Sequence, residues 1–295
     1  MLPIMKYTIP TPMKALEAAS ALYPDSSSRT LINWIKAGRF SVDGERLKRA
    51  NLDLEPGQEI SAQMTFRPQL IPGLKVLYED RYLVAIDKPE GLLSVPLDES
   101  PQTRHGARHA ARHALGLLRE HYQTDQIYAV HRIDRETSGC LIFARGKQSE
   151  QAMKDLFEKH DLTREYFAIL EGRMEGRDGI WENRLIELKN YDVAESEEGK
   201  EAITHYEILH RSPKYTYVKL RLETGRKHQI RVHASTAGYP VLGDERYGSN
   251  ENPIDRMCLH AWKLDFTHPL IEGKKISIRS QLPYAFKKLG GHRFL

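Results

Sequence analysis

One short stretch, AVHRIDRETSG from Ala129 to Gly139, brings a carboxylate together with two arginines and a histidine. Its order is close to the His-Arg-Asp motif of protein kinases, but Asp134 stands one residue too late. A kinase also needs an asparagine five residues beyond its aspartate, a glycine-rich loop and Asp-Phe-Gly, and the sequence has none of them. The sequence also lacks a P-loop, a dinucleotide-binding glycine pattern and a nucleophile elbow, so we predict no cofactor, nucleotide or otherwise.

Three later stretches carry further groups that could act on a substrate. TREYFAILEG, from Thr163, is typical of a strand in which Tyr166 follows charged residues and precedes apolar ones. MCLHAWKLDFTHP, from Met257, is a second strand-like run that ends in His-Pro. The stretch ETGRKHQIRVHASTAGYPVLGDERYG gathers basic and amide side chains, namely Arg226, His228, Gln229, Arg231 and His233.

Together with HRIDRETSG and DKPEGLLSVP, these stretches resemble, in order and spacing, the motifs of the RluA family of pseudouridine synthases. The resemblance covers about Leu74 to Leu289. Three positions depart from the family pattern. Ile133 replaces a leucine and stays apolar, and Arg164 replaces a lysine and keeps the charge. Lys227 replaces a threonine, and its effect on the local contacts is open.

The resemblance implies that uridine in RNA is isomerised to pseudouridine. The bond from uracil N1 to ribose C1′ breaks, the base rotates, and C5 bonds to C1′. Positive charge grows on the sugar, as in a glycosidase, and a carboxylate beside it either attacks C1′ or removes a proton from C2′. By position this carboxylate is Asp134. Both routes need its ionised form, which a neighbouring arginine favours by lowering the pKa of the aspartate.

The resemblance also assigns the remaining site residues. Arg231 is the expected arginine partner of Asp134. Tyr166 is expected against the uracil face, and it is also a candidate for handling the C5 proton. Arg132 is expected to hold the phosphate of a flipped nucleotide or to fill its place in the stack. The full set of expected RNA-binding residues is Arg132, Arg226, His228, Gln229, Arg29, Lys36 and Arg39.

Neighbouring residues are expected to support the loop that carries Asp134. We expect His131, His228 and His233 to be structural hydrogen-bonding groups rather than acids or bases. Thr137 and Ser138 would satisfy backbone groups of the loop, and Gly139 would allow a close approach or a tight turn.

The elements that must position these groups alternate between strand and helix patterns without a fixed repeat. YLVAI, from Tyr82, predicts a strand that ends at Lys88-Pro89. RHGARHAARHALGLLREH predicts a helix with His105, His109 and His113 on one face. This spacing could hold a divalent metal, but the glutamate of zinc proteases is missing. We favour a solvated helix facing phosphate, and we predict no metal. The body is predicted to be α+β, and the resemblance implies a mixed, mostly antiparallel sheet with flanking helices and a cleft holding Asp134.

The N-terminal part has its own pattern. KALEAASALYP and SSSRTLINWIKAG predict two helices, RFSVDGERL a hairpin around Asp43-Gly44, and LEPGQEISA a turn and a strand. From about Pro12 to Phe66 this order resembles the alpha-L RNA-binding module, with a generic basic appendage as the alternative. The predicted organisation is a tail at 1–11, the module at 12–67, a linker at 68–73 and the catalytic domain at 74–290.

Composition limits the class of protein. The chain has 295 residues, 40% of them hydrophobic and 28% charged, which is typical of a globular protein. The sequence shows neither a signal peptide nor eighteen consecutive apolar residues, so we predict no membrane association. We predict that Cys140 and Cys258 are buried free thiols, which favours a cytoplasmic location. The net charge is only +4, but seven Lys/Arg stand against one acid between Arg211 and His233, as expected of a face that meets phosphates.

We therefore predict a cofactor-independent RNA pseudouridine synthase, an isomerase acting on structured RNA. Relatives with such an N-terminal module often modify large-subunit ribosomal RNA, which we favour over transfer RNA. One alternative is a non-catalytic RNA-binding or ribosome-assembly protein, although Asp134, Tyr166 and Arg231 are all present. A second is a glycosidase or nucleosidase acting on small molecules, which would need a second acid and no basic module. The sequence does not indicate the oligomeric state.

Overall fold

The computed structural model describes residues 5–24, 26–36, 38–62, 74–96 and 112–290. The described residues divide into two compact units. One consists of those within 1–67 and 119–125, and the other of those within 68–118 and 126–295. The predicted linker at 68–73 and the histidines His105 and His109 lie outside the described residues. Within the described part, no helix has the length and apolar character needed to cross a membrane.

The first unit pairs two helices with short antiparallel strands. Its core is formed by apolar residues of both helices and of the strands, including the fully buried Leu31, Phe40 and Ile60. Described strands form a sheet of order β1-β6-β3-β4 and a separate pair, β2-β5. The elements are β1 (Met5–Thr8), β2 (Met13–Lys14), α1 (Ala15–Leu22), α2 (Ser28–Lys36), β3 (Phe40–Val42), β4 (Glu45–Arg46), β5 (Asp53–Leu54) and β6 (Glu59–Ala62).

The predicted elements of this unit are confirmed, and one boundary moves. Asp43 and Gly44 both have positive φ, as the tight turn between β3 and β4 requires. The expected tail at 1–11 is wrong for its second half, because Met5–Thr8 pairs along β6 and Ile9 is buried. Pro10 and Pro12, which follow Ile9 closely, hid this edge strand, since proline usually interrupts a strand pattern.

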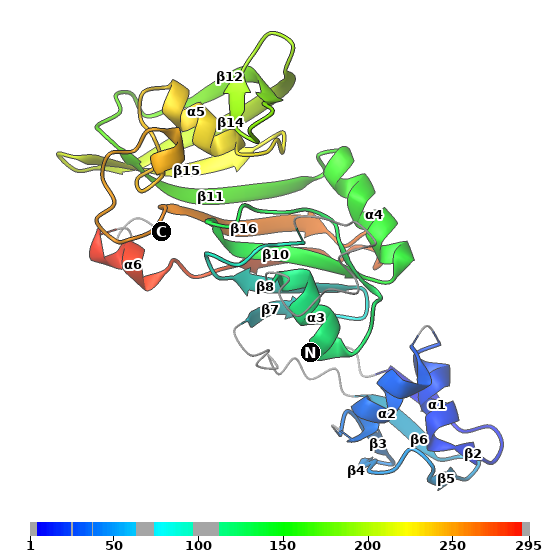
Figure 1. Ribbon diagram of the computed structural model, residues 1–295. Helices are drawn as coiled ribbons and strands as arrows, with labels where there is room; N and C mark the ends of the chain where they lie inside the picture. The colour runs from blue at the N-terminus through cyan, green and yellow to red at the C-terminus, as the bar shows by residue number, and fades with distance from the viewer. Residues whose placement is uncertain (1–4, 25, 37, 63–73, 97–111, 291–295) are drawn as a thin grey trace. The chain divides into compact units, whose positions relative to one another are not determined.

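The second unit is built on one large sheet (Figure 1). Eleven described strands belong to it, in the order β13-β12-β14-β15-β11-β16-β10-β8-β7, with β17 paired to β16 and β9 to β10. β10 and β16 run parallel, and every other pair of named strands is antiparallel. The strands are β7 (Lys75–Glu79), β8 (Leu83–Lys88), β9 (Ile127–Ala129), β10 (Ser138–Arg145), β11 (Leu162–Glu171), β12 (Asp178–Glu187), β13 (Val193–Glu195), β14 (Lys200–Arg211), β15 (Tyr215–Leu222), β16 (Leu259–Thr267) and β17 (Lys275–Arg279).

Helices lie along this sheet and leave its central strands to carry the site. α4 packs against β10, and α5 packs against β12, β13 and β14 (Figure 1). β8 and β10 are almost wholly buried, and the second half of β11 is buried beside them, so these strands form the centre of the unit. The α+β class and the mixed, mostly antiparallel sheet are confirmed. The helices are α3 (Ala114–Tyr122), α4 (Lys147–Glu158), α5 (Gln229–Thr236) and α6 (Tyr284–Lys288), with a short 3-10 turn at Glu245–Tyr247.

Candidate active site

Asp134 lies in the loop between β9 and β10, and the DKPEGLLSVP stretch fixes that loop. The Ser94 hydroxyl donates to the Ile133 carbonyl at 2.7 Å and accepts from the Ile133 amide at 3.2 Å. On the other side of Asp134, the Gly91 amide donates to the Arg135 carbonyl at 2.8 Å. The backbone is thus held immediately before and after Asp134, so the carboxylate has a defined position.

Lys88, at the end of β8, adds a third attachment. Its buried ammonium donates to the carbonyls of Pro89, Leu92 and Arg135 at 2.9, 2.7 and 3.1 Å. Three acceptors use all three N–H groups, so this geometry suits the charged form. Burial lowers the pKa of Lys88 to about 7, and the charge of Asp134 acts in the opposite direction.

Gly139 places the start of β10 against β16. Its φ is +114°, and a Cβ there would lie 2.1 Å from the Ala261 carbonyl oxygen. The predicted close approach at Gly139 is confirmed. The Ser138 hydroxyl instead contacts His260 Nδ1 at 2.8 Å and Arg256 Nη2 at 2.9 Å. The expectation that Ser138 satisfies the backbone of the loop is therefore wrong, because its side chain points to β16 and its neighbours.

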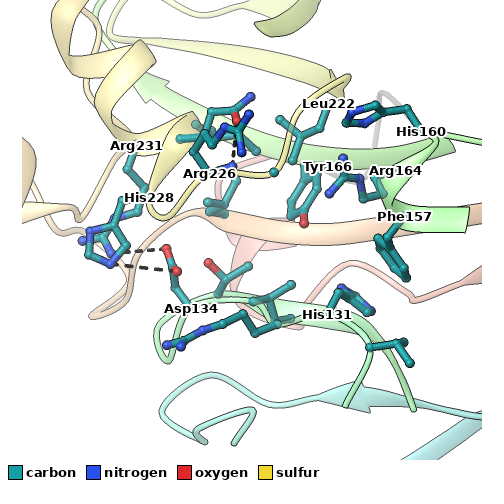
Figure 2. Close-up of a pocket in the computed structure, with 18 of the residues that line it drawn as sticks. His131, Asp134, Phe157, His160, Arg164, Tyr166, Leu222, Arg226, His228 and Arg231 are labelled. Atoms are coloured by element: carbon teal, nitrogen blue, oxygen red, sulfur yellow. Dashed lines mark hydrogen bonds and ion pairs between the residues drawn. The ribbon is translucent and has the colours of Figure 1, made fainter. Parts of the chain in front are cut away.

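Arg231, on α5, is held by an acid that the sequence did not single out. Its Nε and Nη2 donate to the two carboxylate oxygens of Asp244 at 2.7 and 2.8 Å, and both residues are buried. Nη1 then lies 3.4 Å from Asp134 Oδ2 (Figure 2). Burial disfavours the charge of Arg231, but the Asp244 contact outweighs it and raises the pKa of Arg231. Asp244 lies in GDERYG, within a stretch that carries the family resemblance, so a signal was present although it did not indicate the contact with Arg231.

The protonation of Asp134 differs from the expectation. Burial raises the pKa of Asp134, Arg231 and Arg132 lower it, and Asp244 raises it further. The net direction is upward from the ordinary 3.8. Arg231 thus acts in the predicted sense, but the predicted net lowering is wrong because burial of the carboxyl outweighs the two arginines, with a smaller contribution from the charge of Asp244. Asp134, Arg231 and Asp244 together carry one negative charge in a largely buried place.

Tyr166 is placed by an irregularity in β11. The register between β11 and β16 shifts between Glu165 and Tyr166, as in a β-bulge, which turns a side chain out of the regular alternation. Tyr166 is 9% exposed, and its hydroxyl is directed toward the Asp134 loop (Figure 2). Burial raises the pKa of Tyr166 to about 12, so the hydroxyl is protonated at neutral pH.

His228 contacts the far side of the Asp134 carboxylate. The Tyr247 hydroxyl accepts from the Val193 amide at 3.0 Å and lies 2.7 Å from His228 Nδ1, so its own proton is available to that nitrogen. The His228 proton is then on Nε2, which lies 3.9 Å from Asp134 Oδ1. Burial, followed by the charge of Arg231, lowers the pKa of His228 to about 4. Tyr247 was also missed by the sequence reasoning, although its ring lies 4.9 Å from the Arg231 guanidinium.

Gln229 has a different task from the one expected. Its carbonyl oxygen accepts from the Thr224 hydroxyl and the Arg226 amide, and its amide donates to Ile203 and Thr204. All these bonds are internal and Gln229 is 2% exposed. Its side chain therefore fixes the loop before α5. No donor or acceptor of the Gln229 side chain is left to make the expected contact with RNA.

The other histidines have the structural partners that we expected. His131 Nε2 accepts from the Ile142 amide at 3.1 Å, and its ring stacks on Phe157. His233 contacts Thr204 at 2.9 Å and Asn183 at 2.7 Å. His233 thus uses both ring nitrogens within the fold, and His131 uses Nε2.

Asp134, Tyr166, His228 and Arg231 line one cavity of about 530 Å³ (Figure 2). Its size lies within the range of pockets that take a small molecule or a single nucleotide base. Arg132 and Arg226 are exposed lining residues, available to an incoming strand, although Arg226 Nε also donates to the Glu201 carbonyl at 2.9 Å. Arg164 and Gly225 line the same cavity.

The remaining candidates lie elsewhere. Arg29 and Lys36 are exposed on α2 of the first unit, and Arg39 lies over the Trp34 ring at 5.1 Å. Lys227 does not line the cavity, because it pairs with Glu187 and lies 5.4 Å from the centre of the Tyr191 ring. The extra cation at position 227 is thus held by a carboxylate outside the cavity.

Comparison with known proteins gives a consistent answer. The family model described as RNA pseudouridylate synthase matches residues 82–236. The chain is 32% identical to ribosomal large subunit pseudouridine synthase D of Haemophilus ducreyi, over 92% of this chain and 88% of that protein. It is 34% identical to the dual-specificity RNA pseudouridine synthase RluA of Haemophilus influenzae, over 71% of this chain and 94% of that protein.

A solved structure supports the fold. Human RNA pseudouridylate synthase domain containing 1 superposes with a TM-score of 0.58 at 22% identity. The match covers 74% of this chain and 86% of the human chain. The arrangement of strands described above is thus shared with that protein.

Proposed function

This chain belongs to the RluA family of RNA pseudouridine synthases, and we propose that it isomerises uridine in large-subunit ribosomal RNA. The similarity to relatives named for the large ribosomal subunit extends over 92% of the chain, whereas the match to the dual-specificity relative leaves out more than a quarter. Transfer RNA is the competing substrate, and a relative named for dual specificity toward RNA is at least as similar over the part it covers.

The placement of Asp134 beside Arg231 carries the assignment of the site. Asp244 holds two nitrogens of the guanidinium, and the third meets the carboxylate at 3.4 Å. We propose that Asp134 reacts at the ribose, by attack on C1′ or by removing the C2′ proton. In either case its carboxylate must be ionised, and Arg231 supports that form.

We assign Tyr166 to the face of the uracil. Its ring lines the cavity, and a protonated hydroxyl with a pKa of about 12 is a poor base at neutral pH. Packing of the ring against the base is therefore favoured over removal of the C5 proton. His228, neutral and with its Nε2 proton toward Asp134, is proposed to orient the carboxylate rather than to exchange protons.

We propose that RNA is bound by exposed cations of both units. Arg132 lies at the cavity and would hold the phosphate of the flipped nucleotide or fill its place in the stack. Arg226 would contact the strand next to it. The first unit is proposed to act as an alpha-L RNA-binding module, to which Arg29, Lys36 and Arg39 contribute.

The site is tested with Asp134→Asn. This change keeps the size of the side chain but removes the charge that both routes require. We expect pseudouridine formation to fall by at least about a thousandfold, while the affinity for RNA stays within about twofold. Full activity in the variant would overturn the assignment of Asp134.

The substrate is tested by mapping pseudouridines in ribosomal and transfer RNA from cells with and without the gene. We expect one or more positions in large-subunit ribosomal RNA to lose the modification. Loss at transfer RNA positions alone would exclude the proposed substrate while leaving the chemistry intact.

We propose a cytoplasmic location. The relative from Haemophilus ducreyi is named for the large ribosomal subunit, and both cysteines of this chain, Cys140 and Cys258, are buried free thiols. Burial raises the pKa of each thiol to about 12, which keeps them protonated and unreactive.

A further inference from the structure

Arg164, on β11 two residues before Tyr166, lines the same cavity and has an unusual set of contacts. Its Nη2 donates to the carbonyls of Glu223 and Thr224 at 3.3 and 3.2 Å. Its Nε is buried and has no hydrogen-bond partner. Within the described part of the chain, no carboxylate lies within ion-pair distance of this guanidinium. Arg164 therefore brings a positive charge into the cavity wall without an acid to balance it.

Such a charge is costly in a folded protein. Burial lowers the pKa of Arg164, which means that the charged form is disfavoured there. Two of the neighbouring groups carry no charge. Phe157 lies below the guanidinium at 5.7 Å, and His131 has its pKa lowered to about 3 by burial and by Arg164. Two backbone carbonyls compensate only part of this cost, so the position favours an anion that arrives with the substrate.

The loop before α5 leaves room for this guanidinium. A Cβ on Gly225 would lie 2.5 Å from Arg164 Nη1, closer than two such atoms can stand. Gly225 also lines the cavity, so Nη1 lies against a bare stretch of backbone at its wall. The φ of Gly225 lies outside the positive range that favours glycine, so space rather than backbone conformation explains the residue.

We propose that Arg164 stabilises the negative charge that forms on the uracil when its bond to the ribose breaks. This inference rests on the proposed use of the cavity for isomerisation. Cleavage of the bond from N1 to C1′ leaves the electron pair on the base, where it spreads over N1, O2 and O4. A guanidinium donates well to such oxygens, and fixed donors near developing charge lower a barrier strongly.

The proposal holds for either role of Asp134. After the base has rotated, the electron pair of the anion forms the bond from C5 to C1′. The bond of C1′ to Asp134 breaks at that point, or C2′ takes its proton back. The C5 proton is then lost and N1 gains one, which restores a neutral base. Arg164 therefore meets a negative charge only between cleavage and rebonding, so it accelerates the reaction without tightening the binding of RNA.

The first test compares Arg164→Met with Arg164→Lys. Isomerisation is followed in single turnovers at saturating enzyme, on an RNA fragment whose uridine the mapping experiment identifies. We expect Arg164→Met to slow the step by about 100-fold, as for the loss of one oxyanion donor, and the dissociation constant for RNA to change less than about threefold. Arg164→Lys should recover most of the rate. Arg177→Met removes an exposed cation that does not line the cavity and serves as the matched control.

The second test uses 5-fluorouridine in the same RNA, with consumption of the modified nucleoside as the readout. Fluorine withdraws electrons from the ring, so 5-fluorouracil carries the negative charge more easily and depends less on Arg164. The defect of Arg164→Met should therefore be at least about tenfold smaller with 5-fluorouridine. A residue that only supports the fold would slow both substrates equally.

Gly225→Ala provides a variant that keeps the charge. The new Cβ displaces the guanidinium, whose flexible end can move away, so the fold is expected to survive even if Arg164→Met does not fold. We expect Gly225→Ala to slow isomerisation about tenfold, with no further loss when it is combined with Arg164→Met.

Three results would overturn the role of Arg164: an unchanged rate in Arg164→Met, equal defects with uridine and 5-fluorouridine, or weaker RNA binding at an unchanged rate. The last would mean that Arg164 contacts an RNA phosphate. A wild-type protein without isomerase activity would instead overturn the proposed function, so the two failures are distinct.

Discussion

At the scale of residues, the site depends on how charge is divided among Asp134, Arg231 and Asp244. Asp244 takes two nitrogens of Arg231 and leaves one for Asp134, which fixes the direction of the guanidinium. The same contact weakens the support that Arg231 gives to the ionised form of Asp134. Asp244 thus orients the Arg231 guanidinium but also raises the pKa of Asp134. Mutation of Asp244 separates these two effects.

Asp244→Asn should separate them. Removing the negative charge of Asp244 lowers the pKa of Asp134, because Asp244 raises it in the wild type. We expect the acid limb of the pH–rate profile to move to lower pH, while the plateau rate falls by about tenfold because Arg231 is less well held. An acid limb at unchanged or higher pH would contradict this division of charge.

Asp134→Asn should also change the stability of the protein with pH. The folded-state pKa of Asp134 is raised, so its ionised form is less favourable in the folded than in the unfolded chain. The penalty is absent below the ordinary value of 3.8 and grows as pH rises through the folded pKa. We expect the variant to melt about 2–4 °C higher than wild type at pH 7, and at the same temperature near pH 3. Calorimetry at both pH values decides this, and a lower Tm at pH 7 would contradict it.

At the scale of elements, the strands around the site could be predicted and their mutual register could not. The runs YLVAI, TREYFAILEG and MCLHAWKLDFTHP became β8, β11 and β16, because their apolar patterns fit buried strands. The bulge before Tyr166 depends on the pairing of β11 with β16, far along the chain, and has no local signal. Asp244 was missed for the same reason, since only the fold brings it to Arg231.

Gly139→Ala tests the contact between β10 and β16. A Cβ would lie 2.1 Å from the Ala261 carbonyl oxygen, and both atoms belong to the backbone framework of the sheet. We expect a loss of stability of at least about 3 kcal/mol, because the strands must separate. Gly176→Ala is the matched control, since Gly176 also has a positive φ but no atom near its Cβ position. It should cost only about 1 kcal/mol by denaturant unfolding. Equal costs would show that backbone strain, not contact, explains Gly139.

At the scale of the whole molecule, the expected cations fall into two groups. Arg132 and Arg226 belong to the unit that holds the cavity, and Arg29 and Lys36 to the unit with α2. A division of this kind separates the residues that act on the reacting bond from those that add affinity for RNA. Contacts to phosphate far from the target uridine add binding energy without acting on that bond.

The double variant Arg29→Ala, Lys36→Ala tests this division. We expect RNA binding to weaken by about tenfold and the slope of log K against log salt to fall by about 1–2, with an unchanged single-turnover rate at saturating enzyme. Lys6→Ala on the same unit is the control, because its ammonium pairs with Glu59 at 2.8 Å. An unchanged affinity in the double variant would remove α2 from the proposed RNA-binding surface.

The parallel pairing of Gly139 with Ala261 has a consequence for biosynthesis. A growing chain exposes Asp134 about a hundred residues before Arg231, and β16 follows later still. Until β16 has emerged, the strand that begins just after the Asp134 loop has no parallel neighbour. The proposed site can therefore be complete only after residues 259–267, which form β16, have been synthesised.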